Sequence, residues 1–209
     1  MSDPVAVPAT PGVSVWNIAN ALTFVRLLLV PVFAVLLLHD GGNQDGWRIA
    51  ATVVFAIASL TDRLDGELAR RRGLITDLGK IVDPIADKAL IGTALVGLSW
   101  LGELSWWVTV IVLVRELGVT ALRFVVIRHG VMPASRGGKV KTFLQAVAIG
   151  LYLLPLEGPG QDIAAVVMAA AVVVTVVTGA DYVARAIRLR RTSERAQRKR
   201  AERAARSGG

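Results

Sequence analysis

Long apolar stretches alternate with short polar breaks along almost the whole chain. Each stretch is close to the ~20 residues that an α-helix needs to cross the hydrocarbon core of a bilayer. The breaks contain glycine and several contain acidic residues, which is typical of turns between helices. The pattern therefore predicts six transmembrane helices, over Asn17–Leu38, Trp47–Ala69, Ile81–Leu101, Leu104–Ile127, Val140–Leu156 and Ile163–Ile187.

Basic residues gather in alternate breaks. The first, third and fifth breaks contain no Lys or Arg, apart from Arg48 at an edge, whereas the second, the fourth and the C-terminal tail are basic. Because cytoplasmic loops carry an excess of Lys and Arg, we expect both termini and the second and fourth breaks to lie in the cytoplasm. The prediction is an all-α, multi-pass bundle in the plasma membrane of a bacterium.

Composition supports this class of protein. Of 209 residues, 54% are hydrophobic, which leaves no room for a separate soluble domain. We expect residues 1–16 to form a flexible leader, 17–187 the transmembrane catalytic domain and 188–209 a basic cytoplasmic tail. The net charge of +8 is concentrated in that tail, directly after an apolar span. Such a position favours contact with anionic lipids over nucleic acid.

Four aspartates stand out against the apolar background. Asp62 and Asp65 are three residues apart near the end of the second span, and Asp83 and Asp87 are four apart near the start of the third. Both spacings place a pair on one face of a helix. The two spans are joined by a short basic break, so we expect them to be antiparallel neighbours whose carboxylates converge at the cytoplasmic end.

Converging carboxylates need counter-charge. Hard divalent cations such as Mg²⁺ or Mn²⁺ prefer oxygen ligands and often bridge substrate phosphates. The chain has no cysteine, so a metal would be held by oxygen ligands. Gly66 and Ala69, one turn from the acids, leave space for a ligand. Salt bridges from Arg63, Arg70 and Lys88 to single acids are the alternative explanation.

These residues also match a family pattern. The series Asp62-x2-Asp65-Gly66-x2-Ala69-Arg70-x8-Gly79-x3-Asp83-x3-Asp87 resembles the signature of the CDP-alcohol phosphotransferases. The first span, with Asn20, Thr23, Arg26 and Pro31, is similar to the first helix of that family. Three further segments resemble the branch that uses glycerol 3-phosphate as acceptor, namely Arg115-Glu116, Ala121-Leu-Arg123 and Gly138-Lys139-Val-Lys141-Thr142-x2-Gln145.

The resemblance implies roles for these residues. The four aspartates would hold two ions of Mg²⁺ or Mn²⁺, and Asp87 would also take the proton from the acceptor hydroxyl. The acceptor oxygen would attack the β-phosphorus of CDP-diacylglycerol, giving phosphatidylglycerophosphate and CMP. The family commonly forms homodimers. Residues implied to bind the CDP-linked lipid are Asn20, Thr23, Asp62, Gly66, Ala69, Arg70, Thr76 and Gly79.

The sequence determines the identity of the acceptor substrate less well than that of the CDP-linked donor. Arg115, Arg123, Lys139 and Lys141 could bind an acceptor phosphate, which favours glycerol 3-phosphate, although the last three are also ordinary cytoplasmic cations. Arg26 is a further candidate for this pocket. Arg115 needs a partner within its span, and we expect Glu116, which follows it directly, to point elsewhere on the helix.

Alternatives remain at this point. A phosphatidylinositol-phosphate synthase or a CMP-forming cardiolipin synthase of the same family would use the same aspartates. An intramembrane prenyltransferase also places Asp-rich helices around Mg²⁺, and a cation transporter could use carboxylates as an ion path. A prenyltransferase generally has its two Asp-rich motifs on distant helices, whereas here they lie on consecutive helices. A cation transporter would need acids along a path through the membrane, whereas here they lie near the cytoplasmic side alone.

Overall fold

The computed structural model describes residues 17–72, 76–126 and 136–192; beside the gaps, including 63–72 and 123–126, only the backbone is described. The described residues contain no strand and form six α-helices. These are α1 Ile18–Leu38, α2 Asp45–Arg72, α3 Asp77–Trp100, α4 Trp106–Val126, α5 Arg136–Leu153 and α6 Pro159–Thr192, with a 3-10 turn η1 His39–Gly42 after α1. The six predicted spans are confirmed as helices, with ends at most five residues from those predicted.

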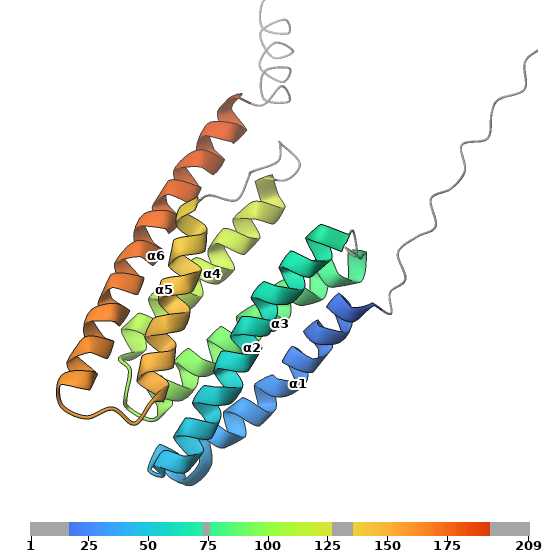
Figure 1. The fold of residues 1–209 in the computed structure, drawn as a ribbon. Helices are drawn as coiled ribbons and strands as arrows, with labels where there is room; N and C mark the ends of the chain where they lie inside the picture. The colour runs from blue at the N-terminus through green and yellow to red at the C-terminus, as the bar shows by residue number, and fades with distance from the viewer. Residues whose placement is uncertain (1–16, 73–75, 127–135, 193–209) are drawn as a thin grey trace, which may run out of the picture.

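Consecutive helices run in opposite directions and form one bundle (Figure 1). Helix α1 packs against α2 and α3, and α6 packs against α4 and α5. We call the end of the bundle that contains the α2–α3 connection the upper end, and the end that contains η1 the lower end. The first residues of α1 and the last residues of α6 both lie at the upper end (Figure 1).

The apolar core is formed mainly by α1, α2, α3 and α5, with smaller contributions from α4 and α6. The Phe33 ring of α1 packs 5.8 Å from the Phe55 ring of α2, measured between ring centroids. Helices α1 and α3 approach closely at Gly97, where a Cβ atom would lie only 2.6 Å from Cδ2 of Leu37. Other buried members of the core are Ala58, Leu90, Leu95, Leu98, Ile149, Leu153 and Met168.

A buried arginine ties the lower end together. Arg48, near the start of α2, donates from Nη2 to the carbonyl of Tyr152 at 2.7 Å and from Nε to the carbonyl of Leu153 at 3.3 Å. Its Nη1 forms an ion pair with Glu103 in the α3–α4 loop. The last carbonyls of a helix have no partner within the helix, so Arg48 caps α5 and joins it to two other elements.

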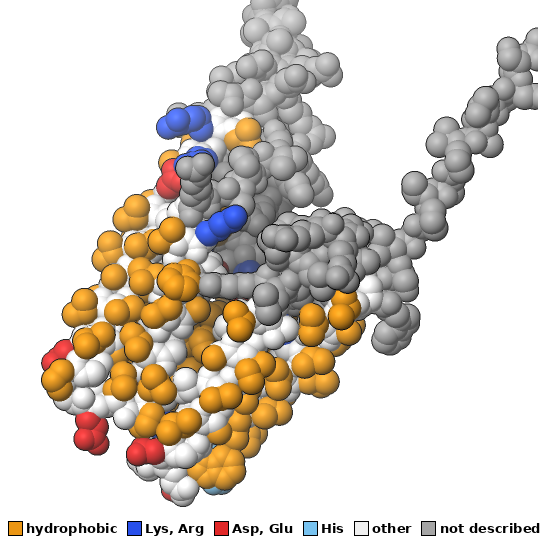
Figure 2. Space-filling model, viewed as in Figure 1, with side chains coloured by type: hydrophobic (Ala, Val, Ile, Leu, Met, Phe, Trp, Pro, Cys, Tyr) orange, Lys and Arg blue, Asp and Glu red, His pale blue; other side chains and the backbone are white. Residues whose placement is uncertain are grey.

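The outer surface of the bundle is apolar over most of the face in Figure 2, and the Lys and Arg side chains visible there lie toward the upper end. Large apolar side chains are well exposed on several helices, including Leu28 at 70%, Val114 at 66% and Val166 at 69%. Two described helices, over Asn20–Gly42 and Pro159–Leu189, are long and apolar enough to cross a membrane. A water-soluble monomer rarely exposes so much contiguous apolar surface.

Candidate active site

Three buried polar side chains lie at three-residue intervals in the upper half of α1. Asn20, Thr23 and Arg26 are 5%, 2% and 1% exposed. Residues three apart on a helix share a face, and this face is directed toward α2 and α3. Because a buried polar group is costly unless it is hydrogen-bonded, the three residues require partners on the neighbouring helices.

Two of these partners are aspartates of the sequence motif. Nη1 of Arg26 donates to Oδ1 of Asp62 on α2 at 2.6 Å, forming an ion pair. Oγ1 of Thr23 donates to Oδ1 of Asp83 on α3 at 2.5 Å. Helix α1 therefore orients one carboxylate on each of the two motif helices.

The third residue, Asn20, contacts the start of α3. Thr76 is the N-cap of α3 and accepts a hydrogen bond from the backbone N–H of Gly79 at 3.0 Å, while its own hydroxyl donates to Oδ1 of Asn20 at 3.0 Å. A Cβ atom at position 79 would lie 2.8 Å from that same Asn20 oxygen. The space that glycine leaves at position 79 is thus filled by Asn20.

The aspartates are described to different extents. Asp62 and Asp87 line one cavity, and Asp83 is exposed at the start of α3. Within the described residues, no three Asp, Glu or His side chains are placed together to hold a metal ion. Four further predicted site residues lie in the part of α2 where only the backbone is described: Asp65, Gly66, Ala69 and Arg70.

A cavity of about 230 Å³ lies between α2 and α5, with Arg26, Asp62 and Asp87 on its polar side. We call it the α2–α5 cavity. Most of its wall is apolar, contributed by Phe55, Ala56, Leu60, Leu90, Ile91, Phe143, Ala146 and Val147. An apolar wall with a few convergent polar groups is typical of a ligand site. This one suits an amphipathic ligand whose charged part lies beside the acids.

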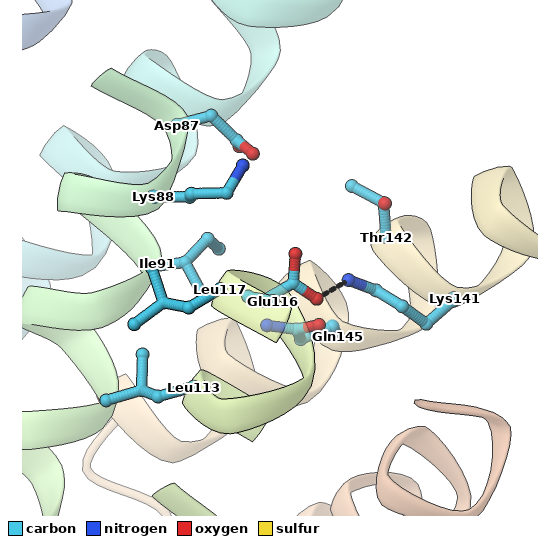
Figure 3. A pocket seen from close by; sticks show the side chains of 9 residues that line it. All are labelled: Asp87, Lys88, Ile91, Leu113, Glu116, Leu117, Lys141, Thr142 and Gln145. Atoms are coloured by element: carbon cyan, nitrogen blue, oxygen red, sulfur yellow. Dashed lines mark hydrogen bonds and ion pairs between the residues drawn. The ribbon is translucent and has the colours of Figure 1, made fainter. Parts of the chain in front are cut away.

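A second, smaller cavity of about 50 Å³ lies among α3, α4 and α5. We call it the α4–α5 cavity; Figure 3 shows the side chains that line it. Its polar groups come from all three helices and include both carboxylates and amines: Asp87, Lys88, Glu116, Lys141, Thr142 and Gln145. A water needs about 10–15 Å³ on this measure of volume, so the cavity admits about three to five water-sized groups.

Asp87 lines both cavities, together with Ile91 and Thr142. Of these three residues it alone has a side chain that ionises near neutral pH. A group bound in the α4–α5 cavity and the polar end of a ligand in the α2–α5 cavity would therefore both lie beside the same carboxylate.

Glu116 departs from the expectation that it points away from Arg115. Its Oε1 accepts from Nη1 of Arg115 at 3.1 Å and also forms an ion pair with Lys141 of α5. Both side chains are long enough to bend back along the helix and meet, although their Cβ atoms point in different directions. Lys141 is consequently held by Glu116 at the wall of the α4–α5 cavity (Figure 3).

The other predicted acceptor residues are placed differently. Nη2 of Arg115 donates to Oγ1 of Thr178 on α6 at 3.1 Å, and neither Arg115 nor Lys139 is among the described residues that line the α4–α5 cavity. Arg26 faces the α2–α5 cavity instead. The side chain of Arg123 lies outside the described part of the chain. Of the predicted cations, the structure brings Lys141 to the smaller cavity.

Residues 16–177 match the family model described as CDP-alcohol phosphatidyltransferase. A protein of Mycobacterium tuberculosis named probable phosphatidylglycerophosphate synthase is 62% identical over 172 residues, which is 82% of each chain. A Bacillus subtilis CDP-diacylglycerol–glycerol-3-phosphate 3-phosphatidyltransferase is 35% identical over 80% of this chain and 93% of that protein. A Streptomyces coelicolor protein named cardiolipin synthase (CMP-forming) is 41% identical over 70% of this chain and 68% of its own length.

The fold is also found in a solved structure. The crystal structure of Mycobacterium tuberculosis phosphatidylinositol phosphate synthase with CDP-DAG bound superposes with a TM-score of 0.61 at 21% sequence identity. The match covers 87% of this chain and 90% of that one. The arrangement of helices is therefore shared with a synthase whose crystal structure contains CDP-DAG.

Proposed function

The chain belongs to the CDP-alcohol phosphatidyltransferase family, and we propose that it transfers the phosphatidyl group of CDP-diacylglycerol to glycerol 3-phosphate, releasing CMP. Family membership sets aside the prenyltransferase and cation-transporter alternatives. Among acceptors, glycerol 3-phosphate is supported by the names of the Mycobacterium tuberculosis and Bacillus subtilis relatives and by the lysines that line the α4–α5 cavity.

The observation that carries this proposal is the position of Asp87 between the two cavities. The apolar α2–α5 cavity suits acyl chains, with the diphosphate at its polar side beside Asp62. The α4–α5 cavity has two carboxylates and two amines among its described lining residues, which suits the charged and hydroxyl groups of a phosphorylated alcohol. Holding two reactants on either side of one group converts a bimolecular reaction into an effectively unimolecular one.

The donor set fits a divalent metal. The motif supplies four carboxylates, Asp62, Asp65, Asp83 and Asp87, and no thiolate, which suits Mg²⁺ or Mn²⁺ rather than a softer ion. Arg26 donates a hydrogen bond to Asp62 and Thr23 donates one to Asp83. Hydrogen bonds of this kind orient the carboxylates that hold a metal ion. These four aspartates would hold two ions, which supply positive charge to the attacking and leaving oxygens when bound.

The chemistry of the chain's own residues follows from this placement. Asp87 takes the proton of the acceptor hydroxyl, since a general base must lie within hydrogen-bond reach of that proton. The acceptor oxygen forms a bond to the β-phosphorus, and the bond from that phosphorus to the bridging oxygen breaks. CMP leaves with the bridging oxygen, and the phosphatidyl group is then esterified to the acceptor.

Lys141 binds the acceptor phosphate in this proposal. It lines the α4–α5 cavity and its ammonium is held by Glu116. A charge-assisted hydrogen bond to phosphate is stronger than a neutral one, so a single buried lysine can dominate the affinity for the acceptor. The same role for Arg115, Arg123 and Lys139 stays a prediction.

The chain is a membrane protein, and we propose that all six helices cross the bilayer with the upper end in the cytoplasm. The exposed apolar side chains on several helices and the basic upper end support this orientation. It places both substrates' polar parts on the cytoplasmic side of a bacterial plasma membrane. Homodimer formation, and contact of the tail over 188–209 with anionic lipids, also stay predictions.

The test is CMP release by the purified protein in detergent with CDP-diacylglycerol and Mg²⁺. Glycerol 3-phosphate, inositol 1-phosphate and phosphatidylglycerol are added in separate reactions. We expect CMP with glycerol 3-phosphate alone, and a loss of activity in EDTA that either Mg²⁺ or Mn²⁺ restores. Release with phosphatidylglycerol or inositol 1-phosphate instead would contradict the proposed acceptor and favour the corresponding alternative synthase.

A further inference from the structure

Gln145 of α5 is a buried polar residue to which the chemistry above assigns no role. Its side chain is only 3% exposed, and its amide oxygen Oε1 has no hydrogen-bond partner among the described residues. A buried acceptor without a partner is costly, and such groups in folded proteins are rare and call for an explanation. A ligand that donates a hydrogen bond to this oxygen is one explanation.

The position of Gln145 points to the ligand in question. It lines the α4–α5 cavity together with Asp87, Lys88, Glu116, Lys141 and Thr142, and it lies beside the Glu116–Lys141 pair (Figure 3). Gln145 is four residues after Lys141 on α5, so the two side chains share a face. The cavity that we assign to the acceptor therefore contains the proposed base Asp87, two lysines and, within the described part of the chain, an unpartnered hydrogen-bond acceptor.

The chemistry of an amide oxygen restricts what it can bind. It accepts hydrogen bonds and cannot donate them, so it has no attraction for the oxygens of an ionised phosphate. A hydroxyl group, by contrast, donates readily to it. In glycerol 3-phosphate the phosphate matches Lys141 and the reacting hydroxyl matches Asp87, which leaves the hydroxyl on the middle carbon for Gln145.

We propose that Oε1 of Gln145 accepts a hydrogen bond from the acceptor hydroxyl that does not react, and that this contact selects polyol phosphates over simple hydroxyalkyl phosphates. The inference rests on the proposed function and adds a specificity-determining residue to it. A site that hydrogen-bonds a substrate hydroxyl rejects an analogue without that hydroxyl, because the protein group is then left buried and unpaired.

The experiment compares two acceptors that differ by one oxygen. Glycerol 3-phosphate and 3-hydroxypropyl phosphate, which lacks the middle hydroxyl, are each supplied with CDP-diacylglycerol and Mg²⁺, and kcat/KM is measured from CMP release. We expect the wild-type protein to prefer glycerol 3-phosphate by about tenfold or more. In Gln145→Met, which keeps the length of the side chain without the amide, the preference should fall to about threefold or less.

Matched variants test whether the change in acceptor preference is specific to Gln145. Gln161→Met makes the same change at an exposed position on the first turn of α6, and it should retain the wild-type preference. Gln145→Asn, which keeps an amide but shortens the side chain, should give an intermediate preference. Both acceptors are measured on one preparation, so a smaller folded fraction lowers both rates equally and leaves their ratio unchanged.

Two outcomes would overturn the inference. The wild-type protein could use both acceptors equally well, or the preference could persist unchanged in Gln145→Met. Either would leave the proposed function standing, because CMP would still be released with glycerol 3-phosphate. Failure of the wild-type protein with both acceptors would instead remove the proposed function itself, so the two failures are distinct.

Discussion

The upper and lower ends of the bundle each contain a buried arginine, and the two arginines are used differently. Arg26, at the upper end, forms an ion pair with Asp62 and faces the α2–α5 cavity. Arg48, at the lower end, bonds two carbonyls at the end of α5 and forms an ion pair with Glu103 of a loop. The upper arginine orients a carboxylate that we propose as a metal ligand, whereas the lower one satisfies backbone groups.

The difference shows that the burial of an arginine does not by itself indicate a functional role. A buried arginine in an apolar bundle is costly and attracts attention as a functional candidate. The nature of its partner decides between function and structure: a motif carboxylate beside a cavity in one case, and helix-end carbonyls in the other. Substitutions at the two positions should therefore separate activity from stability.

Removal of the upper arginine should have the largest effect of the three substitutions that test this contrast. Arg26→Met removes the ion pair that Arg26 forms with Asp62, and we expect kcat/KM to fall about 10- to 100-fold, as for loss of a residue that supports a metal ligand. The concentration of Mg²⁺ that gives half-maximal activity should rise as well. Arg26→Lys, which keeps the charge, should recover part of the activity, and an unaffected Mg²⁺ dependence in Arg26→Met would contradict this role.

Replacement of Lys141 should have an intermediate effect, confined to the binding of the acceptor. Lys141→Met removes the ammonium that we assign to the acceptor phosphate, and KM for glycerol 3-phosphate should rise about tenfold or more. KM for CDP-diacylglycerol should stay within about twofold, since Lys141 does not line the α2–α5 cavity. The control is Arg185→Met, which removes an exposed cation at the same end of the bundle. An equal rise in KM for both substrates would count against a specific acceptor contact.

The lower arginine should affect activity least. Arg48→Met leaves two carbonyls and Glu103 without this partner, and we expect the thermal midpoint of the detergent-solubilised protein to fall by about 5 °C. Activity per folded molecule, measured well below that midpoint, should stay within about twofold of wild type. A large loss of activity without a change in midpoint would show that the two ends are not separable in this way.

Much of the fold could be predicted from the sequence because each helix is marked by its own run of apolar residues. The ends of α1 and α4 fell within two residues of the prediction, since polar breaks delimit them sharply. The pairing of helices was less predictable. The many contacts of α1 with α3 depend on Gly97 and Gly79, whose spaces are filled by Leu37 and Asn20 of α1, and no local pattern reveals which distant side chain fills a glycine's space.

The candidate site could be predicted where the sequence spacing of residues on a helix determines it. It was harder to predict where contacts depend on the length and bending of side chains. The aspartate spacing places Asp83 and Asp87 on one face of α3, and the structure adds that Asp62 and Asp87 line the same cavity. The Arg115–Glu116–Lys141 cluster was missed because helical geometry describes where Cβ atoms point, while long side chains can bend to meet. Gln145 belongs to a segment that resembles the glycerol 3-phosphate branch, but no role was predicted for it, because its burial without a partner for Oε1 among the described residues is visible only in three dimensions.

The most direct test of the central claim concerns Asp87, the carboxylate that both cavities share. CMP release from CDP-diacylglycerol and glycerol 3-phosphate is measured for the wild-type protein, for Asp87→Asn and for Asp181→Asn, the same change at an exposed position on α6. We expect Asp87→Asn to lose about 10²- to 10⁴-fold in rate, the contribution of a general base, and Asp181→Asn to stay within about twofold. An Asp87→Asn protein that releases CMP at the wild-type rate would contradict the claim that this carboxylate joins the two substrates and takes the proton.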